Sequence, residues 1–402
     1  MKRWLRSFSY GVVITSRPFQ FSGATSHLFT LRLNVSFVRN FMNILLHSNY
    51  SPTNSHGGIE VIVGQLIDLI QLLDFNVSCF YGDHISSVRS EGSVTYISRR
   101  IFGKIGGAPV LNLGNLSFLY YGIKSSLVIF QEPFPLLWPA VFILRFFFRK
   151  PMIVVVHADP AAHRSVKLIY NVLRRWIFRG AICVTTSPNL GKKVFYKSFQ
   201  SCEIIPLSIP DVEHFDCNVN LAIPSQFALY VGRLANYKGI NILLDAAELT
   251  PQVKYVIAGD GPFKPFILEA IKTKLLNNIH FINRFVTEQE KVYLIEQSCF
   301  LIFPSTSENE AFGLVQLEAM RAGRPIVNTF LDSGVNFVAP DMVCALTVEP
   351  NNPKQLCDAI LRIWNDKPLR LRLGTQGKER YFELFTPDRF ISSWVNLLGR
   401  IA

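Results

Sequence analysis

The sequence predicts an α/β fold built from two units of similar organisation. From residue 43 onward, short uninterrupted apolar segments alternate with segments of helical periodicity, and the alternation restarts after residue 205. Apolar segments of this kind are typical of parallel strands that helices cover on both faces. The length of 402 residues is enough for two or three domains, each with a core of its own.

The first unit opens with an expected strand at residues 43–48, and a turn-rich segment at 50–58 follows it. A helix is expected next, because apolar side chains recur there with a spacing of about 3.6 residues, at Ile59, Ile62, Val63, Leu66, Ile67, Ile70 and Leu73. Further strands are expected at 77–82, 126–130, 152–157 and 181–187.

The second unit contains expected strands at 227–233, 254–259, 279–282, 299–305 and 324–329. The boundary is placed in residues 205–217, where prolines and a polar run break the pattern. We therefore assign 42–205 to a first domain and 206–385 to a second. Residues 386–402 are expected to cross back to the first domain as a helix, which is capped by Thr386, has Pro387 at its first position and carries one apolar face of Phe390, Trp394, Leu397 and Leu398.

The composition excludes a disordered chain, since 49% of the residues are apolar and only 17% are charged. The longest apolar stretch, residues 134–148, is interrupted by two prolines and an arginine, whereas a membrane-spanning helix needs about 20 apolar residues. The seven cysteines show no CxxC spacing, so neither a disulfide framework nor a zinc site is indicated. We expect a soluble or peripheral protein of a reducing compartment.

Residues 1–41 do not share this pattern. They hold six basic residues and no acidic one, within a net charge of +12 for the chain. Three interpretations stay open: a translation start at Met42, an Arg- and Ser-rich organelle transit peptide, and a basic membrane-binding arm. A secretory signal is disfavoured, because no apolar core of about 7–15 residues follows the basic residues.

A glycine-rich turn lies between the first expected strand and its helix, where Gly57 and Gly58 precede Ile59 and Glu60. Glycines allow a ligand to approach the backbone closely, and the free amides of a helix start attract anions. A phosphate site and an ordinary strand-to-helix turn both fit this segment. It is not the dinucleotide fingerprint, because the third glycine is missing.

A basic loop, GRLANYKG, follows the first strand of the second unit at residues 232–239. Arg233 and Lys238 flank it, and a helix is expected to begin near Ile240. Two cations beside a helix start could clamp a diphosphate and neutralise a departing phosphate. The alternative is a solvated basic loop.

The most specific signal is ENEAFGLVQLEAMRAG, which follows the strand at 299–305. A helix from about Phe312 to Ala322 would place Glu310 in the loop before it and Glu318 two turns inside. The amides of Gly313 and Leu314 would then be free donors at the helix start. Two carboxylates so placed could bind hydroxyls on two parts of one elongated ligand.

These motifs together resemble glycosyltransferase family 4. GGIE at 57–60, GRxxxxKG at 232–239, GDGP at 259–262 and ExFGxxxxEAMxxGxP at 310–325 stand in the family's order. TSPN at 186–189 and NTFLDSGV at 328–335 are similar to a subgroup that makes bacterial surface polysaccharides, many of them mannosyl or other hexosyl transferases. The resemblance covers residues 42 to about 400 and implies a GT-B fold, in which two Rossmann-like domains face each other across a central cleft.

The resemblance also implies roles for individual residues. Glu318 matches the glutamate that binds the nucleotide ribose, and Glu310 matches the one that contacts sugar hydroxyls near the anomeric centre. Arg233 and Lys238 match the diphosphate clamp. The other matching positions are Gly57 and Gly58 in the facing loop, Phe312, Gly313 and Leu314 as backbone contacts, Phe285 near the base, and His157 near the sugar, where it ends a strand at the ligand-binding edge of the sheet.

The implied reaction is retaining, metal-independent transfer of a hexose, with mannose favoured. The donor would be a nucleotide-diphosphate sugar, the acceptor a lipid-linked or growing surface glycan, and no cofactor is implied. No Asp-x-Asp occurs in the chain, which disfavours metal-dependent chemistry of the GT-A type. Two other classes stay open, namely a nucleotide-sugar 2-epimerase of the same fold and a non-catalytic basic protein that binds membrane or nucleic acid.

Nucleic acid is not an expected partner, because no basic cluster with interleaved aromatics accompanies a recognisable motif. The apolar segment 134–150 and the cluster of Arg174, Arg175 and Arg179 allow two interpretations. One is a helix that covers the sheet with a solvated basic face, and the other is peripheral contact with an anionic membrane. We expect a cytoplasmic location that includes the inner face of the cytoplasmic membrane.

Overall fold

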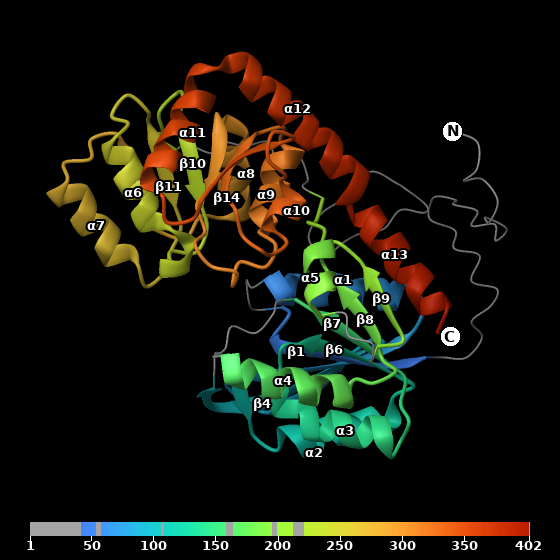
Figure 1. The fold of residues 1–402 in the computed structure, drawn as a ribbon. Helices are drawn as coiled ribbons and strands as arrows, with labels where there is room; N and C mark the ends of the chain where they lie inside the picture. Colours follow the sequence, from blue (N-terminus) through green and yellow to red (C-terminus); the bar gives the residue numbers. More distant parts are fainter. Residues whose placement is uncertain are drawn as a thin grey trace, which may run out of the picture.

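The computed structural model describes residues 42–53, 58–105, 108–157, 164–194, 199–211 and 221–401. The alternatives drawn for residues 1–41 concern a segment outside this part of the chain. Within it, two α/β units lie side by side, and each is centred on a predominantly parallel sheet (Figure 1).

The first sheet has nine strands in the order β3-β4-β2-β1-β6-β7-β8-β9, and β5 pairs with β4. Strands β3 and β5 are antiparallel to β4, whereas the other pairs are parallel. The strands are β1 (Asn43–Tyr50), β2 (Asn76–Asp83), β3 (Ser87–Glu91), β4 (Val94–Ile105), β5 (Ala108–Leu111), β6 (Leu127–Glu132), β7 (Met152–Val156), β8 (Ile182–Thr185) and β9 (Ser201–Ile204).

Helices cover both faces of this sheet, because the central strands carry apolar side chains on both faces. Val128 and Phe130 of β6 pack into one cluster with α2, α3 and the end of α4, whereas Leu127 and Ile129 belong to a cluster that contains α1 and α13. The helices of this unit are α1 (Gly58–Leu72), α2 (Gly114–Lys124), η1 (Pro135–Leu137), α3 (Trp138–Phe146), α4 (Arg164–Ile177) and α5 (Pro188–Val194).

The second sheet has six strands, all parallel, in the order β12-β11-β10-β13-β14-β15. Numbered within the unit, this order is 3-2-1-4-5-6, that of the doubly wound fold. The strands are β10 (Ala228–Val231), β11 (Tyr255–Ala258), β12 (Ile279–Ile282), β13 (Phe300–Phe303), β14 (Ile326–Thr329) and β15 (Ala345–Val348). All strands expected from the sequence in both units are therefore present.

The helices of the second unit begin where the sequence offers capping groups. Thr287 and Glu290 form a capping box before α8, and Asn352 and Asp366 cap helices that have proline in the first turn. The helices are η2 (Asn236–Lys238), α6 (Ile240–Glu248), α7 (Lys264–Thr273), α8 (Glu288–Gln297), α9 (Leu314–Arg321), α10 (Val335–Val338), α11 (Pro353–Asn365) and α12 (Lys367–Leu384).

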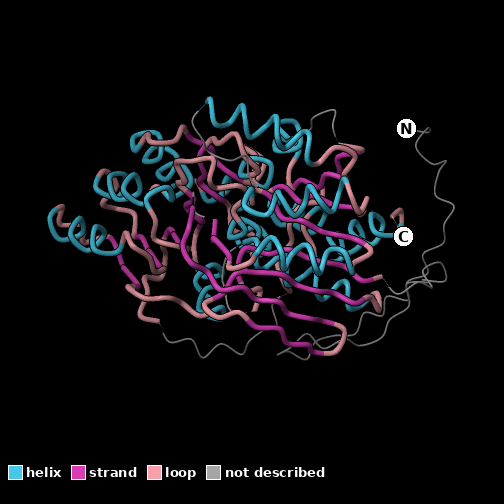
Figure 2. Tube along the Cα trace, turned by 90° about the horizontal axis from the view of Figure 1, so that it is seen from below, coloured by secondary structure: helices cyan, strands magenta, loops and turns pink. Residues whose placement is uncertain are grey.

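The last helix, α13 (Pro387–Gly399), has the predicted Thr386 cap and proline start. The four residues of its predicted apolar face are all buried. It runs from the second unit down along the first, where Arg400 Nη1 lies 3.1 Å from Glu203 Oε1 of β9 (Figure 1). In Figure 2 the C-terminus lies on the side opposite α7, the helix at the far left of both views. The domain boundary near residue 205 itself stays a prediction.

The interpretation of the arginine cluster as a solvated basic face is wrong for one of its members. Arg174 of α4 is fully buried, and its Nε lies 3.0 Å from Oε2 of Glu132, which ends β6. Trp138 Nε1 and Tyr170 Oη also donate to this carboxylate, at 2.8 and 3.0 Å. The sequence shows three arginines of equal appearance, and only the rotation of α4 against the sheet decides which one is internal.

Candidate active site

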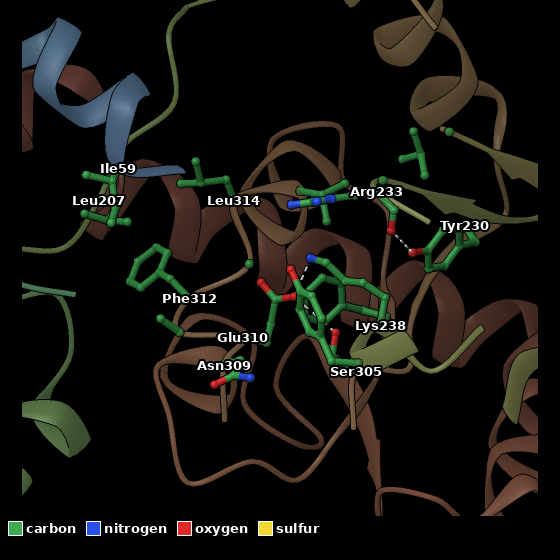
Figure 3. A pocket seen from close by; sticks show the side chains of 18 of the residues that line it. Ile59, Leu207, Tyr230, Arg233, Lys238, Ser305, Asn309, Glu310, Phe312 and Leu314 are labelled. Atoms are coloured by element: carbon green, nitrogen blue, oxygen red, sulfur yellow. Dashed lines mark hydrogen bonds and ion pairs between the residues drawn. The ribbon is translucent and has the colours of Figure 1, made fainter. Parts of the chain in front are cut away.

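A cleft of about 750 Å³ lies between the two units and receives residues from both. This volume is typical of sites that enclose a small organic ligand. From the first unit it is lined by Ile59, Ile62, Pro133, His157, Thr186 and Leu207. From the second it is lined by the loops after β10, β11 and β13 and by the start of α9 (Figure 3).

The predicted basic loop and the predicted glutamate loop meet because of the strand order. Strands β10 and β13 are neighbours at the position where the order of the second sheet reverses, and ligands of doubly wound sheets bind at the carboxyl ends of the strands at that position. Arg233 follows β10 and Glu310 follows β13, so the fold brings together two segments that are more than seventy residues apart.

Lys238 forms an ion pair with Glu310 at the centre of the cleft (Figure 3). Ser305 Oγ donates to the same carboxylate at 3.2 Å, and the lysine ammonium lies 5.4 Å from the ring centre of Tyr237 and 5.5 Å from that of Phe303. Both side chains are mostly buried, with 16% and 11% of their surfaces exposed. The fold thus holds an ammonium and a carboxylate in a fixed position where a polar ligand can reach them.

Gly239 makes this position of Lys238 attainable. Its φ of 69° lies in the left-handed region, and a Cβ on it would lie 1.9 Å from the backbone oxygen of Pro304. Glycine is therefore required where the basic loop turns into α6 against the end of β13.

Arg233 also lines the cleft, but its guanidinium has no hydrogen-bond or ion-pair partner among the residues that the structure describes. The residue is exposed, and its carbonyl oxygen accepts a hydrogen bond from Tyr230 Oη at 3.0 Å, which fixes the backbone beneath it. A free cation on a fixed backbone beside the Lys238 ammonium is suited to an anionic ligand.

The helix after the glutamate loop begins later than predicted. Helix α9 starts at Leu314, not near Phe312, because Gly313 adopts a φ of 79° just before it. Phe312 is buried, and a Cβ on Gly313 would lie 2.6 Å from Cζ of Phe303. Phe312, Gly313 and Leu314 all line the cleft, so the start of α9 lies at its wall. Glu318 lies little more than one turn into the helix rather than two.

Glu318 is not among the described residues that line the cleft, and it pairs with a lysine that the sequence analysis did not identify. Lys291 of α8 lines the cleft, and its Nζ is 2.8 Å from Oε1 of Glu318 and 2.7 Å from Oε2 of Glu288. The other oxygen of Glu318, Oε2, is buried and has no hydrogen-bond partner within the described residues. Burial raises the pKa of Glu318, and Lys291 opposes that change. Burial would lower the pKa of Lys291, but the two carboxylates outweigh it and raise that pKa.

His157 follows β7 and lines the cleft from the first unit. Its Nε2 lies 2.6 Å from Oε1 of Gln131, and its backbone N–H donates to the carbonyl of Glu132 at 3.1 Å. Burial lowers the pKa of His157 to about 4, so the imidazole is neutral near pH 7. The fold therefore presents a neutral, oriented imidazole to the cleft.

The remaining predicted residues are placed unequally. Phe285 lines the cleft with 57% of its surface exposed. Gly57 lies outside the described residues. Gly58 is the first residue of α1, and Ile59 and Ile62 of the same helix line the cleft.

Several known proteins are similar to this chain. O-antigen chain mannosyltransferase C from Escherichia coli is 27% identical over 369 residues, which cover 88% of this chain and 96% of the relative. D-rhamnosyltransferase WbpZ from Pseudomonas aeruginosa is 27% identical over 264 residues, 62% of this chain and 68% of the relative. Sucrose-phosphate synthase from Thermosynechococcus elongatus has a TM-score of 0.72 at 20% identity, and covers 90% of this chain and 99% of its own. Anabaena HepE, solved with UDP and glucose, has a TM-score of 0.66 at 17% identity, over 89% and 100% of the two chains.

Two doubly wound units that share a cleft, together with these structural neighbours, define the GT-B fold, and the predicted fold class is confirmed. The protein is a glycosyltransferase. Residues 219–380 match the family described as glycosyl transferases group 1. The resemblance predicted from the motifs is likewise confirmed.

Proposed function

We propose that the protein transfers a hexose, with mannose favoured, from a nucleotide-diphosphate sugar to a lipid-linked or growing surface polysaccharide, with retention of the anomeric configuration. The observation that carries the proposal is the position of Arg233 and Lys238 beside the start of α9 in one cleft. The names of the two bacterial relatives, an O-antigen chain mannosyltransferase and a D-rhamnosyltransferase, support the polysaccharide and the kind of sugar.

The proposed donor follows the charges along the cleft. The diphosphate is bound by Arg233, Lys238 and the amides at the start of α9, the ribose by Glu318, the base near Phe285 and the sugar near Glu310 and His157. The buried, unpartnered Oε2 of Glu318 supports the assignment of a hydroxyl ligand there, because such an oxygen is costly to leave without a hydrogen bond.

The proposed chemistry needs charge stabilisation more than a protein nucleophile. The bond between the anomeric carbon and the phosphate oxygen breaks, and its electron pair leaves with the nucleoside diphosphate. The acceptor oxygen attacks from the same face, and its proton passes to the leaving diphosphate. Each donor aimed at that diphosphate is worth about 3 kcal/mol in a cleft without water. No covalent intermediate and no metal ion are part of the proposal.

The test is transfer from labelled nucleotide sugars to acceptors in a membrane extract. We expect a lipid-extractable or polymeric product that carries the label. The transferred sugar should keep the anomeric configuration that it had in the donor. Lys238→Ala and Glu310→Gln should each lower kcat/KM at least about a hundredfold, if each removes one transition-state contact. Lys354→Ala changes an exposed lysine of α11 and serves as the matched control.

Transfer that stays undiminished in both cleft variants would contradict the assigned roles. Conversion of the nucleotide sugar by the purified protein alone, without any acceptor product, would indicate the 2-epimerase instead. A binding panel of nucleotide sugars, read as the rise in Tm, identifies the donor independently of the acceptor.

A further inference from the structure

Helix α4 carries an apolar stripe on its outer side. Ile169, Val172, Leu173 and Trp176 are spaced as one helical face, and 62%, 56%, 45% and 55% of their surfaces are exposed. A helix that covers a sheet normally directs such a face inward, so this stripe is an exception that packing among the described residues does not explain.

The inner side of the same helix is fixed. Arg174 is buried against Glu132, and Ile177 at the end of the helix is buried as well. A rotation of α4 that would bury the stripe would expose the Arg174–Glu132 pair and separate two charges that stabilise each other. The stripe is therefore held outward by the ion pair on the opposite side of the helix.

The end of α3 extends the stripe into a broader surface. Phe142 and Phe146 stack on Trp176, with ring centres 5.0 and 5.2 Å apart from it, and Phe147 is 73% exposed. We call Phe146, Phe147, Ile169, Val172, Leu173 and Trp176 the α3/α4 face. Contiguous exposed apolar residues of this kind mark interaction surfaces on soluble proteins.

The two segments that carry the α3/α4 face contain charges of one sign. Residues 134–150 and 164–180 contain no aspartate and no glutamate, and Arg149, Arg175 and Arg179 are exposed beside the face. A second copy of this face would bring arginines against arginines. An anionic bilayer surface offers the opposite charge together with an apolar layer beneath it, which is the environment that Trp, Phe and Arg favour at a membrane interface.

We propose that the α3/α4 face docks on an anionic phospholipid bilayer, with Trp176 and its apolar neighbours inserted at the level of the headgroups. None of the described helices is both long and apolar enough to cross a membrane, so the contact is one of surface insertion. The docked helix is connected to the cleft through Glu132, whose carbonyl accepts the N–H of His157. The docking itself does not depend on the proposed function. Its purpose, which is to bring the cleft to a lipid-linked acceptor, rests on that function.

The test is co-sedimentation of the full chain with phosphatidylglycerol-containing vesicles and with pure phosphatidylcholine vesicles, without donor or acceptor. We expect binding to the anionic vesicles alone. Leu173→Ser combined with Trp176→Ser should weaken it by about tenfold or more, since two exposed apolar side chains no longer enter the bilayer. The control is Leu371→Ser combined with Phe382→Ser on α12 of the other unit. These two apolar residues are 62% and 55% exposed, and their replacement should leave vesicle binding unchanged.

Any binding contributed by residues 1–41 is common to all these chains, so the difference between variants isolates the face. Arg175→Glu with Arg179→Glu is a second variant that keeps every apolar side chain of the face, and it should weaken binding to the anionic vesicles.

Brominated lipids should quench the fluorescence of the wild type more than that of Trp176→Phe. Equal sedimentation of wild type and both face variants would overturn the proposal. The proposal would also be overturned if the wild type did not bind vesicles but formed a dimer that the face variants lose. In that case the face would bind a second copy of the chain. The vesicle assays contain neither donor nor acceptor, so their results would stand even if the protein transferred no sugar.

Discussion

Lys193 of α5 and Asp332 of the loop after β14 join the two units, with Nζ and Oδ2 2.9 Å apart. Glu308, two residues before Glu310, lies at the same distance from Nζ. One lysine of the first unit therefore contacts two loops of the second beside the cleft. The ion pairs are partly exposed, and pairs of this kind contribute about 0.2–1 kcal/mol.

We expect Lys193→Ala to favour the open arrangement of the units. The proposed donor contacts of the second unit are left intact, so the donor Kd should change little. We expect kcat to fall by roughly fivefold, because about 1 kcal/mol of closure is lost. Lys192→Ala, at the adjacent exposed position, is the control. A parallel rise in the donor Kd would show that Lys193 acts on donor binding instead.

Lys291→Met should leave the Glu318 carboxylate without its counter-charge. Stability should fall by about 1–3 kcal/mol, as for a buried polar group that loses its partner. The double variant Lys291→Met/Glu318→Gln should recover most of that stability in urea unfolding, but not donor affinity in calorimetry. Lys274→Met, which removes a more exposed lysine from Asp245 and Glu248, should cost less than about 1 kcal/mol. Donor binding by the double variant at wild-type strength would exclude Glu318 from the site.

Gly239→Ala should destabilise the protein by at least about 2 kcal/mol, because it forces a left-handed residue against the carbonyl of Pro304. It should also reduce transfer by displacing Lys238. Gly64→Ala lies inside α1 with nothing within 4 Å of the added Cβ, and it should instead raise the stability by about 0.5–1 kcal/mol. Thermal unfolding of the two variants compares the effects, and a neutral Gly239→Ala would contradict the described turn.

The stability of the protein should depend on pH through His47. Burial lowers the pKa of His47 from 6.5 to about 3, since the ring lies among Phe118, Phe130 and Phe134. The unfolded chain thus binds a proton below pH 6.5 that the folded chain does not, and His47 removes stability as the pH falls from 6.5 towards 3. Buried carboxylates with raised pKa values act in the opposite direction, so the difference between wild type and His47→Leu is the informative quantity.

Relative to the wild type, His47→Leu should gain about 2 kcal/mol between pH 7.5 and pH 5, at about 1.4 kcal/mol per pH unit below 6.5. Urea unfolding at both pH values measures it. His84, which is exposed, is the matched position, and His84→Leu should show no such gain. A pH-independent difference for His47→Leu would contradict a neutral buried imidazole.

Continuous apolar runs predict the parallel strands well, because a strand that is buried on both faces leaves little ambiguity in its pattern. The same rule misses β3 and β5, which are antiparallel to β4, and it also misses the parallel strands β4, β9 and β15. All five residues of β3 are exposed and its sequence is SVRSE, so the hairpin with β4 is held by strand pairing rather than by an apolar face. The available sequence signal for this hairpin was Gly92, which follows Glu91. In the structure Gly92 adopts a φ of 59° at the turn.

The candidate site divides in the same way. Arg233, Lys238 and Glu310 follow strand ends that the sequence predicts, and the doubly wound order then brings them together. Lys291 could not be found, because TEQEK looks like the exposed first turn of a capped helix, with Glu288 as an ordinary surface partner. Its contact with Glu318 depends on the packing of α8 on α9, which no local pattern encodes.

Helix α13 has a consequence for synthesis of the chain. The strands of the first sheet leave the ribosome early, yet Trp394 and its neighbours belong to the core cluster that includes Leu127 and Ile129 of that sheet. That core is incomplete until α13 has been synthesised, so the nascent first half exposes an apolar surface to chaperones while the second half is made. Loss of α13 would therefore damage the part of the protein that was translated first.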